Sequence, residues 1–207
     1  SEHGVLELGK ISNLKYEQIW DKLAKNNIKC GVFGIMNSKL NDNYNIKFYV
    51  PDPWNYTQKA KPNSLNLLIS LSRYYSTNYS NINFIKLSYY FLKSFIFLIL
   101  KINIFFKISF FYKILMILKN FKLKSVGLFL INDYISVLTF SYLKNKYNTN
   151  FDIIFLNSIA HFQHNYWGNL SEKQNKFFFY IIDHLIGVLI KNNDKFLIAN
   201  GFSQYKN

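Results

Sequence analysis

The stretch Phe151-Asp-Ile-Ile-Phe-Leu156, followed at once by Asn157-Ser-Ile-Ala-His-Phe-Gln-His-Asn-Tyr-Trp167, decides the fold class. Its first six residues are a short apolar run of the kind that forms a buried strand. One helical pattern precedes the run over 134–146, and another follows it over 174–191. Strands that are separated by helices usually build a parallel sheet. We therefore predict an α/β fold with a mostly parallel sheet flanked by helices.

The same alternation occurs at both ends of the chain. A helical pattern over 16–26 is followed by a β-like run over 28–35, and residues 195–199 are predicted to form a last strand. Between them, 37–62 holds all three prolines and many asparagines, which predicts an irregular surface connection. The range 64–122 is mostly helical in pattern, so we expect a helical insert within one domain over 1–207.

The chain carries a formal net charge of +14, which favours an anionic partner. However, Arg73 is the only arginine, and the abundance of Lys, Asn, Ile, Phe and Tyr is typical of an AT-rich gene. Coding bias therefore accounts for part of the excess, and nucleic acid is not the expected partner. Because Cys30 is the only cysteine, an intramolecular disulfide and a cysteine-based metal site are excluded.

The apolar segment 91–118 raises the question of a membrane span. Five lysines recur about every six residues along it and just beyond it: Lys93, Lys101, Lys107, Lys113 and Lys119. No uncharged run therefore reaches the roughly 18 to 20 residues that a span needs. We favour one or two buried helices, broken near Asn103 or Ser109. Contact with a membrane surface, with the lysine stems reaching the headgroups, is the alternative. Residues 1–9 do not resemble a signal peptide, and the compartment stays open.

The strongest chemical signal is the pair His161 and His164. Histidines three residues apart share one face of a helix, where they could ligate one metal ion or hold one anion. No Asp or Glu lies between Asp152 and Glu172, so the carboxylate that usually accompanies metal-binding histidines is absent locally. The alternative interpretation is that both histidines only pack against or cap the segment.

Four neutral polar residues are further candidates for substrate binding: Asn157, Gln163, Asn200 and Gln204. Their side chains can donate to or accept from sugar hydroxyls and phosphate oxygens. They follow the predicted strands, where functional residues of parallel sheets gather, although ordinary loop hydrogen bonds would also explain them. Farther along the chain, we expect Asp183 on the surface of its helix and Gly187 at a point of close packing.

Several motifs occur in an order that resembles one known family. They are Ser1-Glu-His-Gly-Val5, Gln18-Ile-Trp-Asp-Lys-Leu-Ala24, Lys29-Cys-Gly-Val-Phe33, Ala160-His-Phe-Gln-His-Asn-Tyr-Trp167, Tyr180-Ile-Ile-Asp-His-Leu-Ile-Gly187 and Ile198-Ala-Asn-Gly-Phe202. Together they resemble the type I phosphodiesterase and nucleotide pyrophosphatase branch of the alkaline phosphatase superfamily. The resemblance implies that the chain covers part of an alkaline phosphatase-like α/β domain.

The resemblance also implies two metal ions, usually zinc, and a Thr or Ser nucleophile that cleaves phosphate esters. His164 matches a metal-ligand histidine, whereas Ala160 and the pair Ala199-Asn200 replace expected ligands. The nucleophile would precede Ser1, and the last histidine would follow Asn207. Zinc or another divalent metal is thus an expectation for the full-length protein, with most ligand positions in this chain replaced.

Three functions follow as hypotheses. The first is a divergent phosphodiesterase-like hydrolase or phospho-group transferase that acts on a small phosphorylated or sugar substrate. The second is a catalytically inactive module that binds a glycan or a phosphorylated ligand. The third is a peripheral membrane protein, since the lysine-studded segment could contact a membrane surface.

Overall fold

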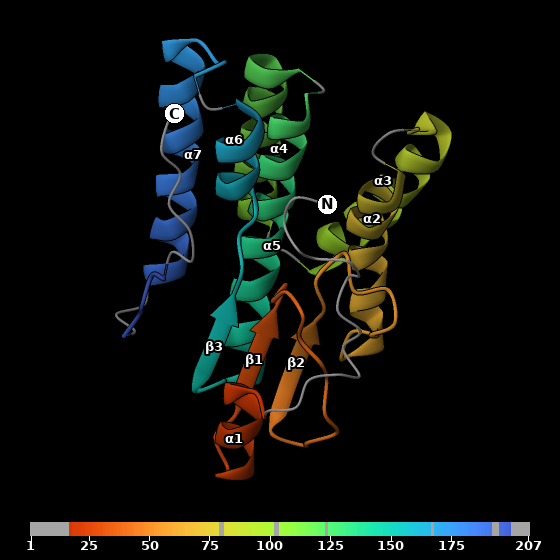
Figure 1. Cartoon of the computed structure of the whole chain (residues 1–207), viewed down its shortest axis with the longest axis vertical. Coiled ribbons are helices and arrows are strands. Elements are labelled where there is room, and N and C mark those ends of the chain that lie inside the picture. The colour runs from red at the N-terminus through yellow and green to blue at the C-terminus, as the bar shows by residue number, and fades with distance from the viewer. Residues whose placement is uncertain are drawn as a thin grey trace, which may run out of the picture. The chain divides into compact units, whose positions relative to one another are not determined.

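The computed structural model describes residues 17–78, 81–101, 104–122, 124–166, 168–191 and 195–199. Within these ranges lie seven α-helices and one three-stranded sheet (Figure 1). The chain divides into two compact units. The first unit comprises Ser1–Ile102 and Tyr142–Phe155, and the second comprises Asn103–Ser141 and Leu156–Asn207. The predicted α/β class is confirmed.

The sheet belongs to the first unit and is parallel, as predicted. Strand β1 (Cys30–Phe33) lies between β2 (Ile46–Val50) and β3 (Phe151–Ile154), and it runs parallel to both. All residues of β1 are buried, which is typical of the central strand of a parallel sheet. The predicted strands over 28–35 and 151–156 therefore both exist, and both are shorter than expected.

Gly31 of β1 is required by the packing of its two neighbouring strands. It pairs with Phe48 on β2 and with Asp152 on β3. A Cβ atom added at Gly31 would lie 2.1 Å from Cζ of Phe48 and 2.4 Å from Oδ1 of Asp152. The Phe48 ring thus occupies the space above β1 that any side chain at this position would fill.

Helices cover the sheet within the first unit. Helix α1 (Ile19–Lys25) packs Trp20 and Ala24 against a buried cluster that includes Val32 and Tyr49. Phe48 contacts Tyr147, near the end of helix α5 (Ser125–Tyr147), with ring centroids 6.3 Å apart. Side chains of the strands therefore make apolar contacts both with α1 and with the end of α5.

Strand β2 corrects the prediction that 37–62 is irregular throughout. The prolines lie outside the strand, and four of its five residues are buried. The run Ile46-Lys-Phe-Tyr-Val50 has the β-branched and aromatic residues that strands favour. A five-residue run becomes a strand only when a partner is present, and that partner, β1, lies before the connection in the sequence.

The helices predicted over 64–122 are present. A short 3₁₀ turn, Asn63–Leu65, leads into α2 (Asn66–Asn78), and α3 (Phe84–Lys101) and α4 (Ile104–Phe121) follow. Helices α2 and α3 lie in the first unit, where the Ser94 hydroxyl donates to the Leu67 carbonyl at 3.1 Å. Helix α4 lies in the second unit. Helix α3 therefore ends at Lys101 and α4 begins at Ile104, and the break expected near Asn103 lies outside the described residues.

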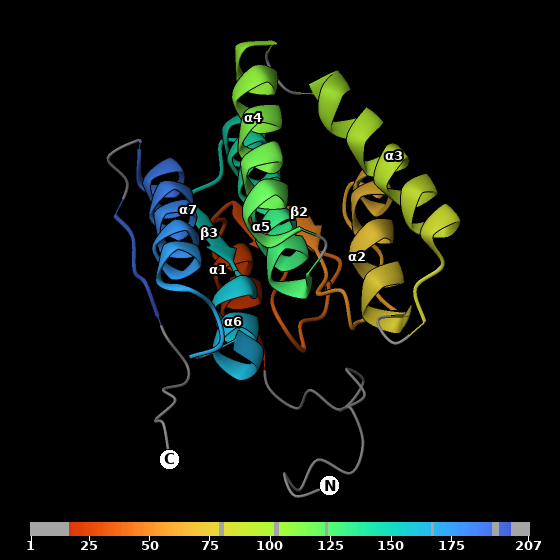
Figure 2. The same cartoon turned by 90° about the horizontal axis from the view of Figure 1, so that it is seen from above.

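The second unit packs α4 and the first part of α5 with α6 (Ser158–Tyr166) and α7 (Glu172–Ile190). Figure 2 shows α4 beside α7, where the Gln174 side-chain amide donates to the Asn120 carbonyl at 2.8 Å. Helix α4 also contacts α5, where the ring of Phe110 stacks on that of Tyr134 at 5.7 Å. Apolar side chains of all four helices form the core of this unit.

Helix α5 is, within the described ranges, the one helix that is long and apolar enough to cross a membrane, and 67% of its most apolar window is buried. Core helices and membrane spans both have this composition.

The strand predicted over 195–199 is wrong, because these residues form no ladder and Phe196, Leu197 and Ile198 are exposed. An apolar run indicates a strand, but only pairing creates one. Asp183 is exposed, as expected.

Candidate functional site

The start of helix α6 is held by a buried carboxylate that belongs to helix α5. The backbone N–H of Ser158 donates to Oδ2 of Asp133 at 2.8 Å, and that of Asn157 donates to Oδ1 at 3.2 Å. The first N–H groups of a helix have no partner within the helix, so one carboxylate here satisfies two of them. The segment that follows β3 in the chain is therefore fixed within the second unit.

Asp133 has little access to water, since only 2% of its surface is exposed. Burial raises the pKa of this carboxyl to about 6, and the hydrogen bonds from Ser158 and Asn157 oppose the rise without cancelling it. A carboxyl of this kind changes charge within the range of mildly acidic pH. Its protonation would alter the negative charge that faces the start of α6.

His161 lies one turn into α6 and is half-buried between aromatic rings. Its ring centroid is 3.8 Å from that of Phe129 and 6.1 Å from that of Tyr166. Burial lowers the pKa of His161, and the charge of His164 lowers it further. The imidazole of His161 is therefore neutral at pH 7.

The hydrogen bonds of His161 indicate which ring nitrogen carries the proton. The side-chain nitrogen of Asn165 donates to the His161 carbonyl at 3.2 Å and lies 3.2 Å from Nδ1 of the same residue. Since this nitrogen is a donor, Nδ1 acts as an acceptor, and the proton of the neutral ring lies on Nε2. Nε2 is buried and has no hydrogen-bonding partner within the described part of the chain. His161 thus presents an N–H donor that lacks an acceptor there.

Of the six predicted binding residues, His161 and His164 lie along one face of α6, and Asn157 immediately precedes this helix. The His161 N–H donates to the Asn157 carbonyl at 3.0 Å, so Asn157 is one turn before His161, and His164 follows three residues later. Gln163 is two residues from His161, which places it about 200° away around the helix. Asn200 and Gln204 lie outside the described residues, as does Trp167.

Two contacts fix α6 within the second unit. The buried ring of Phe162 stacks on that of Phe178 of α7, with centroids 4.5 Å apart. At the end of the helix, the hydroxyls of Tyr166 and Ser125 are 2.7 Å apart and share a hydrogen bond. The histidine face therefore has rigid support, as a binding site requires.

The described residues do not supply a complete metal-binding set. No three His, Cys, Asp or Glu side chains within the described ranges are grouped closely enough to hold a metal ion. His164 is exposed, and Ala160, one turn before it, has no donor atom where the resemblance expects an aspartate. These described residues alone therefore do not make a zinc site.

A second polar cluster lies in the first unit, around Arg73 of α2. Its guanidinium donates to the Asn55 carbonyl at 2.8 Å and to the Gln58 carbonyl. Burial raises the pKa of nearby Asp52 to about 6, although a backbone hydrogen bond and the charge of Arg73 lower it in part. Because the guanidinium is engaged by loop carbonyls, we interpret this cluster as an anchor for the connection after β2.

Sequence reasoning missed the residues that support the site. Asp133 and Phe129 contact the site from α5, and Asn165 orients His161 from within α6. One signal was present, since Asp133 is a lone carboxylate in an apolar helical stretch, and buried carboxylates usually have a role.

Comparison with known proteins gives no assignment for this chain: no family model, no curated protein and no solved structure matches it. Among the residues of the chain itself, the strongest candidate for a binding surface is the face of α6 that carries His161 and His164, with Asn157 just before the helix.

Proposed function

We propose that the chain is part of a divergent phosphodiesterase-like hydrolase or phospho-group transferase, in which one face of α6 binds a phosphoryl group. The observation that carries the proposal is the buried N–H at Nε2 of His161, which has no acceptor within the described residues. A buried donor without a partner costs roughly 1–3 kcal/mol, so such a group suggests a ligand that is present during function.

The chemistry of the face favours an acceptor-rich ligand. His161 in its neutral form donates from Nε2, the imidazole of His164 can donate from the same face, and Asn157, just before the helix, carries a further amide donor. The oxygens of an ionised phosphate diester accept hydrogen bonds and cannot donate them. The excess of lysine in the chain would also raise the local concentration of an anionic substrate.

In the proposed reaction, the residues of this chain bind and orient the phosphoryl group. The N–H of His161 would donate to a phosphoryl oxygen, and this bond would strengthen as negative charge develops on that oxygen. Asp133 would act as a positioning residue, because it holds the start of α6 through Asn157 and Ser158. The nucleophile would come from outside the described residues.

Turnover of bis(p-nitrophenyl) phosphate and of p-nitrophenyl phosphate by the full-length protein tests the proposal. Replacing His161 or His164 with alanine should lower kcat/KM by about 10²–10³, the usual effect of losing a donor to a developing oxyanion. His184→Ala on α7 is the matched control and should leave turnover unchanged. Undiminished activity of both α6 variants would remove the assignment.

A binding module without catalysis is the second candidate. It is favoured by Ala160, which lies one turn before His164 where the resemblance expects a carboxylate, and by the lack, within the described ranges, of any group of three His, Cys, Asp or Glu side chains. Calorimetry with phosphorylated and glycan ligands separates the two candidates. Binding that depends on His161, in a protein that turns over neither ester, would support the module.

A further inference from the structure

Helix α3 exposes a continuous apolar stripe. Five large apolar residues follow one another at steps of three or four, and their exposed fractions range from 49% to 83%: Ile85, Tyr89, Leu92, Ile96 and Leu100. This spacing places all five along one side of the helix. We call these residues the α3 stripe.

The opposite side of α3 already has a partner, helix α2 of the same unit. Ser94, Phe97 and Leu98 are buried there, and the rings of Tyr90 and Tyr74 contact each other with centroids 5.2 Å apart. The α3 stripe is therefore not the core-facing side of the helix. Large exposed apolar patches of this kind are typical of surfaces that bind a partner or a membrane.

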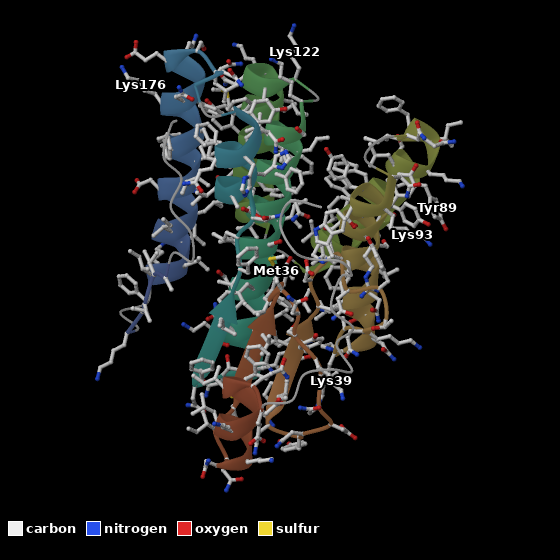
Figure 3. The ribbon with its side chains drawn as sticks, in the orientation of Figure 1. Met36, Lys39, Tyr89, Lys93, Lys122 and Lys176 are labelled. Atoms are coloured by element: carbon white, nitrogen blue, oxygen red, sulfur yellow. The ribbon has the colours of Figure 1, made fainter. Side chains whose placement is uncertain are left out.

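The charges around the stripe indicate the kind of surface that it meets. Lys86 and Lys93 are seven residues apart and so line the same edge of the stripe. The ammonium group of Lys93 lies 4.3 Å from the centre of the Tyr89 ring, and both side chains project from the same side of α3 (Figure 3). No Asp or Glu occurs between Asp52 and Asp133, so nothing in that range offsets these positive charges.

We propose that α3 lies in the interface of an anionic lipid bilayer, with the α3 stripe among the acyl chains and Lys86 and Lys93 at the headgroups. Apolar residues on one side of a helix with lysines along its edge are typical of interfacial helices, and the amphipathic ring of Tyr89 suits the boundary between acyl chains and headgroups. A second copy of the chain fits poorly, because two chains of formal charge +14 repel each other. This inference is independent of the proposed phosphoryl site.

Co-sedimentation of the full-length protein with vesicles tests the proposal. We expect binding to phosphatidylcholine vesicles that contain phosphatidylglycerol, and little binding to phosphatidylcholine alone. Replacing both Leu92 and Ile96 with glutamate should weaken binding at least about tenfold. The matched control replaces the exposed Ile19 and Tyr44 of the same unit with glutamate and should bind as well as the unmodified protein.

A charge test uses two pairs of lysines. Changing Lys86 and Lys93 to glutamine should weaken binding about thirtyfold, since each lysine near an anionic surface contributes about 1 kcal/mol. Changing Lys39 and Lys47 to glutamine removes the same net charge from elsewhere in the first unit and should have a much smaller effect. Equal losses for the two pairs would indicate general charge attraction and would overturn the proposal.

Insertion can be measured directly with a tryptophan in place of Tyr89. Brominated lipids should quench the fluorescence of the Tyr89→Trp variant more than that of Tyr44→Trp. Tyr44 is a good control, because it is also exposed and has a lysine, Lys47, 3.5 Å from its ring centre. Equal quenching contradicts insertion of α3. The proposal is also contradicted if the unmodified protein binds no vesicles and forms a dimer that the Leu92 and Ile96 substitutions convert to a monomer.

Discussion

The carboxylate of Asp133 on helix α5 accepts the backbone N–H of Ser158 at the first residue of helix α6, at a distance of 2.8 Å. This contact joins residues that are 25 positions apart in the sequence, and the neighbouring N–H of Asn157 strengthens it. Asp133 therefore holds the start of α6, while the contacts of Phe162 and Tyr166 hold the rest of the helix.

Removal of the Asp133 carboxyl should destabilise the protein. In the Asp133→Ala variant, the N–H groups of Asn157 and Ser158 lose their acceptor, and each lost bond of this kind costs roughly 1–3 kcal/mol. We expect a decrease of about 2–4 kcal/mol in the free energy of unfolding at pH 5, measured with urea. Asp183→Ala on the exposed side of α7 is the control. Equal urea midpoints for the two variants would contradict the structural role of Asp133.

The stability of the protein should fall as the pH rises from about 4 to about 6. Burial raises the pKa of Asp133 to about 6 in the folded protein, so in this window the folded state binds more protons than the unfolded state. The contribution of Asp133 to stability is fully present below the pKa that its carboxyl has in the unfolded chain. It is lost as the pH rises through the pKa of the same carboxyl in the folded protein. For a carboxyl whose pKa is raised to about 6, this contribution to the free energy of unfolding is on the order of 3 kcal/mol.

Asp133→Ala should lose this part of the pH dependence and retain the part that belongs to Asp52, whose pKa is also raised by burial to about 6. The difference in the free energy of unfolding between the unmodified protein and the variant should therefore become smaller as the pH rises from 5 to 8. Urea titrations at a series of pH values measure both slopes. A difference that stays constant, or one that widens with pH, contradicts the raised pKa of Asp133.

The sequence predicted the parallel arrangement of β1 and β3 because each is a short apolar run between helical patterns. It did not predict β2, because the asparagines and prolines around Ile46–Val50 mask a run that becomes a strand only beside β1. It predicted a strand over 195–199 for the converse reason, since an apolar run was present without a pairing partner. Local composition indicates a tendency to form a strand, and pairing decides the outcome.

The histidine pair was predicted from spacing alone, and α6 is helical as that prediction required. The partners of His161 could not be predicted, because Phe129 comes from a different helix and Asn165 could have faced any direction. The lysines of 91–118 are divided between two helices, since α3 ends at Lys101 and α4 begins at Ile104.

Gly31 and Gly187 should respond in opposite ways to replacement by alanine. At Gly31 a Cβ would clash with the Phe48 ring, so Gly31→Ala should destabilise the protein by about 1–3 kcal/mol or more. At Gly187 no atom lies within 4 Å of an added Cβ, which corrects the expectation of close packing there. Gly187→Ala in the interior of α7 should therefore stabilise by about 0.5–1 kcal/mol. Thermal or urea unfolding of the two variants checks both signs.

The thiol of Cys30 should be unreactive in the folded protein. It is fully buried in β1, its hydrogen-bonding contacts are the carbonyls of Ile28 and Trp20, and burial raises its pKa to about 11. Modification by a thiol reagent at pH 8 should therefore be slow and should accelerate on addition of urea, since reaction requires opening of the sheet. A rate equal to that of a free thiol in native buffer would contradict the burial of β1.

The most direct test of the proposed phosphoryl site is a titration of the full-length protein with phenylphosphonate, a stable mimic of a phosphate ester, followed through the imidazole NMR signals. We expect the signals of His161 and His164 to shift together and saturate, while that of His184 on α7 stays in place. We also expect Asn165→Ala, which removes the group that orients His161, to weaken binding. Unchanged signals of His161 and His164, or shifts equal to that of His184, would contradict a phosphoryl site on α6.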